Sequence, residues 1–234
     1  MIEEIDFETY LYVSNNKFKI FVFDKNKSKN LYNREIKASN EFNFQNLNNL
    51  SKFLDENIYK IEKLVGNFIK NIILIIENEE NFHVNIAIKK KNYENFIDQQ
   101  YLENSLTEIK DLFKANYQDY RIMHMIVVNY ILNEKKYASF PREVNSDYLC
   151  LEVNFISISN NLVFALDKVL EKYQVKISQY MCGNYIKSFF EEGNIELPEM
   201  ANKLKKGFNS NEVILVPKNI ENSGFFEKFF QLFS

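Results

Sequence analysis

Histidine and cysteine are the residues best able to do chemistry in this chain, and each occurs only twice in 234 residues. Neither His83 nor His124 has a second histidine or a cysteine at the spacing of a metal site. His124 lies in an apolar run at 123–126, which predicts a half-buried, hydrogen-bonded histidine. Cys182 could act as a nucleophile only beside a base, and a buried structural thiol is the preferred interpretation. We therefore expect no catalytic residues, no metal site and no enzymatic activity.

Phosphate-binding loops are also missing from the sequence. The five glycines stand apart from one another, so neither GxGxxG nor GxxxxGK followed by Ser or Thr occurs. No nucleotide cofactor is expected on this ground. Lysine and arginine total 29 against 32 aspartates and glutamates, a net charge of −3. That sign is wrong for neutralising a phosphate backbone, and nucleic acid is therefore excluded as the expected partner.

The length and composition are typical of a globular protein, and the length allows one domain or two small ones. Hydrophobic residues make up 46% and charged residues 26%, which is typical of folded proteins in water. Two cysteines, and an acidic start at residues 1–6 without an apolar stretch behind it, predict a reduced, cytoplasmic location. No uninterrupted apolar run reaches 18 residues, so no membrane-spanning helix is expected.

Hydrophobic periodicity predicts two successive α+β units. The first contains a hairpin of strands at 7–13 and 17–23, a strand at 31–37, a helix at about 44–68 and a strand at 71–77. The second contains strands at 82–88, 120–132, 148–158 and 175–179, with helices at about 100–115 and 161–173. Asn160 or Asn161 is the expected cap of the later helix. A short helix from 197, a strand at 212–216 and a polar tether at 218–222 follow.

The last eleven residues, GFFEKFFQLFS, form the most informative segment. At about 100° per residue, all six large apolar side chains fall within an arc of about 160°, with no polar residue inside it. Such a helix is about 16 Å long, too short to cross a bilayer and suited to lying in its interface. Burying six such side chains yields on the order of 10 kcal/mol before costs. The expected membrane-binding residues are Phe225, Phe226, Phe229, Phe230, Leu232 and Phe233.

Two features qualify this interpretation of the tail. Glu227, Lys228 and the terminal carboxylate give no net positive charge, so attachment would work by insertion and not by attraction to anionic lipids. The alternative is a tail that folds back on the protein's own core, as in a soluble protein with a self-docked helix. The polar tether and the terminal position favour the membrane.

Read in order, the segments resemble the FtsA family of actin-like cell division proteins. Residues 12–19 (YVSNNKFK) stand where the family has a phosphate hairpin of the form DIGTSKxK, and 63–66 (KLVG) precede the strand at 72–76. Residues 123–133 resemble the LHxxxxx(Y/F)xxD strand of the family's inserted 1C subdomain. Residues 161–175 resemble its NxV helix and the strand after it, and the tail resembles the membrane-targeting helix. The resemblance covers 9–190 and the tail.

The departures from the family pattern concern its nucleotide site. Tyr12 and Ser14 replace the aspartate and glycine of the phosphate hairpin, which removes an acid that would orient Mg²⁺ and a residue that permits close backbone approach. Only 44 residues follow position 190, where the family would begin its second half. That half carries the subdomain that binds FtsZ, so FtsZ binding is not implied. The expectation is therefore a reduced form without a cofactor.

The resemblance implies an α+β, truncated actin-like fold in four parts. Residues 1–81 would be a remnant of subdomain 1A, 82–180 a 1C-like (SHS2-like) subdomain, 181–217 a helix and strand completing the body, and 218–234 the tether and amphipathic helix. It implies a non-enzymatic division adaptor, peripheral on the inner face of the cytoplasmic membrane, that meets FtsN-like proteins through the 1C-like part. Self-association is left open. The alternatives are a PilM-like adaptor of pilus or secretion assembly, or a soluble protein with a self-docked C-terminal helix.

Overall fold

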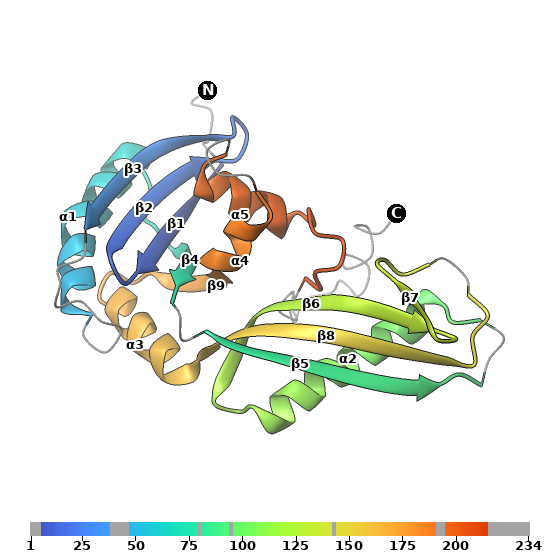
Figure 1. Cartoon of the computed structure of the whole chain (residues 1–234). Coiled ribbons are helices and arrows are strands. Elements are labelled where there is room, and N and C mark those ends of the chain that lie inside the picture. Colours follow the sequence, from blue (N-terminus) through green and yellow to red (C-terminus); the bar gives the residue numbers. More distant parts are fainter. Residues whose placement is uncertain are drawn as a thin grey trace. The chain divides into compact units, whose positions relative to one another are not determined.

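The computed structural model describes residues 6–37, 47–78, 81–93, 96–141, 144–190 and 195–214 (Figure 1). The chain forms two compact units. Unit 1 comprises residues 1–81 and 159–204, and unit 2 comprises residues 82–158 and 205–234. Residues 82–158 of unit 2 are therefore inserted into the sequence of unit 1, and its second segment follows unit 1 in the sequence.

Unit 1 is built on a five-stranded sheet of order β3-β2-β1-β4-β9. The first three strands pair antiparallel, whereas β1 with β4 and β4 with β9 pair parallel. Leu11, Ile20 and Leu74 are completely buried in its interior. The bounds are β1 Phe7–Ser14, β2 Lys17–Asp24, β3 Lys29–Lys37, β4 Asn71–Glu77 and β9 Lys176–Cys182.

Among its described residues, unit 1 has four helices. The longest, α1 (Asn48–Val65), buries Leu50, Phe53 and Ile61 on one face, and its Phe53 ring lies 5.9 Å from that of Phe18 on β2. Gly66 ends α1 at a left-handed φ of 71°, a conformation that glycine adopts without strain. The helix therefore ends before the predicted residue 68, and residues 44–46 of the predicted helix lie outside the described ranges. The other helices are α3 Asn160–Glu171, α4 Gly183–Ser188 and α5 Leu197–Lys205.

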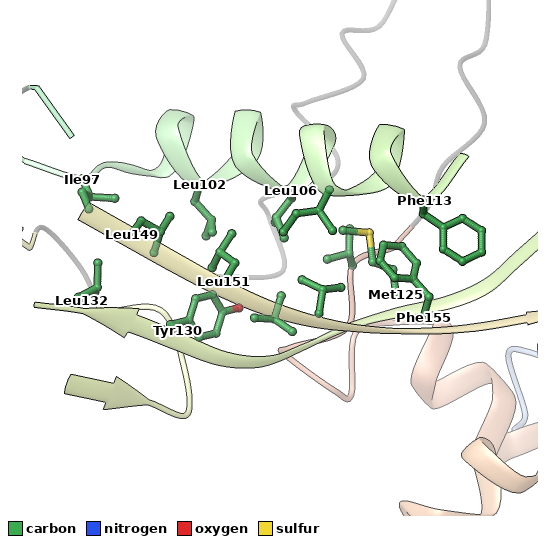
Figure 2. Packing of buried hydrophobic residues seen from close by; sticks show 14 residues of the cluster. Ile97, Leu102, Leu106, Phe113, Met125, Tyr130, Leu132, Leu149, Leu151 and Phe155 are labelled. Carbon is green, nitrogen blue, oxygen red and sulfur yellow. The ribbon is translucent and has the colours of Figure 1, made fainter. Parts of the chain in front are cut away.

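Unit 2 is a four-stranded sheet of order β5-β8-β6-β7, with α2 packed on one face. Figure 2 shows side chains of α2 meeting those of β6 and β8, and the rings of Phe113 and Phe155 stack 4.6 Å apart. Cross-strand partners Val84 and Phe155 share this covered face. The bounds are β5 Phe82–Lys91, α2 Gln99–Asn116, β6 Tyr120–Leu132, β7 Lys135–Tyr137 and β8 Tyr148–Ser159.

A segment near the C-terminus joins the sheet of unit 2. In the part of the chain that the structure describes, β7 pairs with the last residues of β6, and residues 211–213 pair with the middle of that strand. Val127 donates its N–H to the Asn211 carbonyl at 2.8 Å, and Val213 donates to the Met125 carbonyl at 2.8 Å. The predicted strand at 212–216 thus appears as a bridge centred on Glu212, and its residues after 214 lie outside the described ranges.

The structure differs from the predicted boundary at residue 180. The second unit was expected to extend over 82–180, but α3 and β9 belong to unit 1 because β9 pairs with β4. At the start of α3 the cap is Ser159, whose Oγ accepts the Asn161 N–H at 3.3 Å, in place of the expected Asn160 or Asn161. The short elements β7 and α4 were not predicted.

At the level of fold class, the two units give the expected mixture of helices and sheets. No helix within the described ranges is long and apolar enough to span a membrane. The predicted amphipathic helix lies outside the described residues, and so do the residues expected to bind the membrane, Phe225, Phe226, Phe229, Phe230, Leu232 and Phe233.

Candidate functional site at the carboxyl ends of the parallel strands

The three parallel strands of unit 1 end at one edge of their sheet. β1 ends at Ser14, β4 at Glu77 and β9 at Cys182, and Ser14 lies beside Glu77 in the register of β1 and β4. Ligands of open α/β sheets bind outside the carboxyl ends of the strands. This edge is therefore the position in unit 1 where a functional site is expected.

A three-membered polar network occupies the edge. Tyr12 donates its hydroxyl hydrogen to Glu77 Oε2 at 2.7 Å, and Lys187 of α4 forms an ion pair with the same oxygen. The Lys187 ammonium also lies 3.4 Å from the Tyr12 hydroxyl and 5.2 Å from the centre of its ring. One carboxylate oxygen thus joins β1, β4 and α4.

The network fixes the protonation states of its members. Partial burial alone would raise the pKa of Glu77, but hydrogen bonds from Lys187 and Tyr12 outweigh it and lower that pKa below its usual 4.5. Burial alone would lower the pKa of Lys187, and the contact with Glu77 raises it above 10.5. Burial and the hydrogen bond to Glu77 raise the pKa of Tyr12 above 10.0. At neutral pH the three groups are carboxylate, ammonium and uncharged phenol.

Glycine at the start of α4 leaves room for the side chain of Glu77. A Cβ atom at Gly183 would lie 3.2 Å from the Glu77 Cβ and 3.3 Å from its Oε2, so a larger residue there would press on the acid. The neighbouring Cys182 is buried, and its Sγ accepts a hydrogen bond from Asn81 Nδ2 at 3.3 Å. Burial raises the pKa of this thiol above 9.0. Its predicted burial is confirmed, and the thiol form is the unreactive one.

The hairpin between β1 and β2 is closed by its own polar groups. The hydroxyl of Ser14 donates to Asn16 Oδ1 at 2.9 Å and also lies 3.1 Å from the Lys17 carbonyl oxygen. Ser14 is itself buried. The residues that depart from the family's phosphate hairpin, Tyr12 and Ser14, are thus both engaged in contacts within unit 1. Chemically, the edge can stabilise the junction of β1, β4 and α4.

His124, for which the sequence predicts a half-buried, hydrogen-bonded side chain, lies in unit 2 and not at this edge. It is 1% exposed, and its Nδ1 lies 2.6 Å from Glu212 Oε1. The hydrogen bond is confirmed, and the burial is more complete than predicted. An acid beside His124 is what an enzyme would need, but this side chain is shielded from water. The pair instead attaches the 211–213 segment to β6.

Two of the four polar residues at this edge could be recognised from the sequence, and two were missed. Tyr12 and Ser14 were singled out, whereas Glu77 and Lys187 were not. The available signal was positional, because Glu77 is the last residue of a strongly predicted strand and polar residues at strand ends are candidates for a site. Lys187 lies on the unpredicted α4 and gave no comparable signal.

Replacing Glu77 with glutamine should lower the melting temperature at pH 7 by roughly 2–4 °C, because Lys187 loses its charged partner. Since folding lowers the pKa of Glu77, its contribution is present above pH 4.5 and is lost as the pH falls through the folded-state value. The difference between wild type and Glu77→Gln should therefore shrink between pH 6 and pH 3. Thermal unfolding followed by circular dichroism measures it.

Glu56→Gln is the control for this prediction, because Glu56 is exposed on α1. It removes the same charge without touching the network, so its effect should be small. Equal effects of the two substitutions, or a Glu77→Gln difference that grows on acidification, would show that the network does not stabilise unit 1.

The whole chain was compared with known protein families, curated proteins and solved structures. No family model and no curated protein matches it. Similar solved structures include a PilM–PilN type IV pilus biogenesis complex (TM-score 0.47, 7% identity, 78% of this chain and 49% of that one). They also include the cytoplasmic domain of EpsL, an inner membrane component of the type II secretion system of Vibrio cholerae (TM-score 0.34, 9% identity, 77% and 57%). A further one is a Bacteroides thetaiotaomicron protein of unknown function with an actin-like ATPase fold (TM-score 0.33, 13% identity, 81% and 58%).

These similarities concern the backbone fold only. All three TM-scores are below 0.5, and the chain spans between 49% and 58% of the length of each structure. No activity or partner of those proteins is transferred to this chain on that basis.

Proposed function

We propose that this protein is a non-enzymatic adaptor, attached to the inner face of the cytoplasmic membrane by residues 224–233, that connects other proteins to that membrane. The observation that carries the proposal is the complete separation of apolar and polar side chains in the last eleven residues. A helix of that length and pattern is suited to lie in the membrane interface.

The candidate site supports a role without catalysis. The acid and the base at the carboxyl edge, Glu77 and Lys187, are paired with each other, and Tyr12 adds a hydrogen bond to the same carboxylate. A ligand entering this edge would have to break an ion pair and a hydrogen bond before forming its own contacts. We therefore propose that the protein acts through membrane attachment and through protein-binding surfaces, with unit 2 as the part that contacts partners.

Two assemblies are candidates for what the adaptor serves. The resemblance of ordered segments to FtsA favours the division ring, with an actin-like body and an FtsN-like partner. The alternative is a pilus or secretion assembly, the context named for PilM–PilN and for EpsL. Both candidates share the membrane-attached adaptor role, and they differ in where the protein should accumulate.

Cell fractionation and imaging test the proposal in the native host. The full chain should pellet with membranes, and a chain lacking residues 223–234 should remain in the soluble fraction. A fluorescent protein fused at the N-terminus leaves the tail accessible. A midcell ring supports division, and accumulation elsewhere on the membrane supports the alternative. A truncated chain that still pellets with membranes would contradict the attachment.

A further inference from the structure

The edges of the two sheets are not equally protected. Native proteins usually blunt sheet edges with charges, irregular pairing, short strands or a cover. Edge strand β3 carries several charged residues and pairs irregularly with β2 near Val22, and β9 pairs irregularly with β4 near Ile72. In unit 2, β7 has three residues, and the neighbouring part of β6 is paired with residues 211–213.

β5 is less protected than these edges over its first seven residues, which are followed by lysines at 89–91. It is the end strand of its sheet and pairs with β8 over ten residues, from Phe82 opposite Ser157 to Lys91 opposite Tyr148, without a register shift. Within the described ranges, its only strand partner is β8. Residues 82–88 (FHVNIAI) contain no aspartate, glutamate, lysine or arginine. A long, regular edge of this kind is a template for another strand.

Side chains on both faces of β5 are accessible to a neighbouring strand. Val84, Ile86 and Ile88 face the α2 core but are only partly buried. His83 and Lys89 lie on the opposite, open face and are exposed. Because alternate residues of a strand share a face, the edge offers an apolar row on one side and a polar row on the other.

We propose that β5 pairs antiparallel with β5 of a second copy of this chain about a two-fold axis, which joins two four-stranded sheets into one continuous sheet. Most homo-oligomers are closed by such an axis. The charge pattern of the strand suits a second copy in the antiparallel direction, because all three lysines lie at one end, at positions 89–91. Antiparallel pairing sends these ends apart, whereas parallel pairing would set lysine beside lysine.

The side chains select one register. With the axis at Ile86, Ile86 meets its own copy, Val84 meets Ile88, and His83 meets Lys89. Moving the axis to Ala87 would place Val84 opposite a lysine and lose an apolar pair. An axis between Ile86 and Ala87 would place the α2-covered faces of the two copies on opposite sides of the joined sheet. The register at Ile86 therefore retains the apolar row and opposes no two lysines.

Charge substitutions at His83 test this register, with sedimentation of the full chain measured over a range of concentrations. Each substitution acts at two symmetry-related places in the dimer. His83→Lys should weaken the dimer roughly five- to tenfold by opposing Lys89, and His83→Glu should strengthen it by a similar factor. The double variant His83→Glu with Lys89→Glu should weaken it again. These side chains lie on the open face, away from the α2 core, and hydrogen exchange of α2 verifies folding.

Thr107→Lys is the matched control, because Thr107 is exposed on α2 and the change adds the same charge outside β5. It should leave the dissociation constant of the dimer unchanged. Any association through the C-terminal tail is common to all variants and cancels in the comparison. A chain that stays monomeric at every concentration, or a dimer that does not respond to the charge at position 83, would overturn the proposal.

Discussion

Phe229→Glu should release the chain from phospholipid membranes, lowering its partition coefficient by about a hundredfold or more. The substitution removes a side chain worth about 1.5–3 kcal/mol of burial and places a charge at about 40° on the helical projection, inside the apolar arc. Each 1.4 kcal/mol corresponds to about a factor of ten in binding. Sedimentation with neutral phosphatidylcholine vesicles at increasing lipid concentration measures the change.

Gln231→Glu is the matched control for this variant. It adds the same negative charge at about 240°, among the polar residues of the segment, so the partition coefficient should stay within a few-fold of wild type. Equal losses for the two substitutions would mean that charge, and not the apolar stripe, governs attachment. No loss with Phe229→Glu would favour a tail that docks on the protein itself.

The second large effect is expected in unit 2. Phe155→Ala should destabilise this unit by about 3–5 kcal/mol. Phe155 is completely buried, and its ring stacks on Phe113 of α2 at 4.6 Å, so truncation leaves a cavity between sheet and helix. Hydrogen exchange of peptides from β6 and β8 should accelerate strongly, while peptides from β1 and β4 keep the protection of unit 1.

Phe164→Ala makes the same chemical change at a residue that is 61% exposed on α3. It should alter stability by less than about 1 kcal/mol. If Phe155→Ala were as mild as this control, the cluster in Figure 2 would not be the core of unit 2. If it also released β1 and β4, the two units would unfold as one.

Local patterns predicted the elements well where one face of a strand or helix is buried. The predicted strands at 71–77 and 120–132 agree with β4 and β6, because continuous or alternating apolar residues have few other solutions. α1 ends at Val65, three residues before the predicted end at Phe68, because Gly66 turns the backbone although the apolar periodicity continues to Phe68. Three-residue β7 and six-residue α4 are too short to show a period.

Long-range pairing could not be derived in the same way. β9 was predicted as a strand, but its parallel pairing with β4 joins residues about a hundred positions apart, and no local pattern encodes such a partner. The candidate site depends on the same pairing. Tyr12 and Glu77 are 65 residues apart, and Lys187 is 110 residues from Glu77, so their shared oxygen follows only from the assembled sheet.

Flotation of the full chain with vesicles of phosphatidylcholine alone tests the central claim most directly. The full chain should float with the vesicles, and a chain lacking residues 223–234 should stay at the bottom of the gradient. Added salt should not release the full chain, because insertion of apolar side chains does not depend on charge. A full chain that stays behind, or a truncated chain that floats equally well, would contradict attachment through the C-terminal phenylalanines.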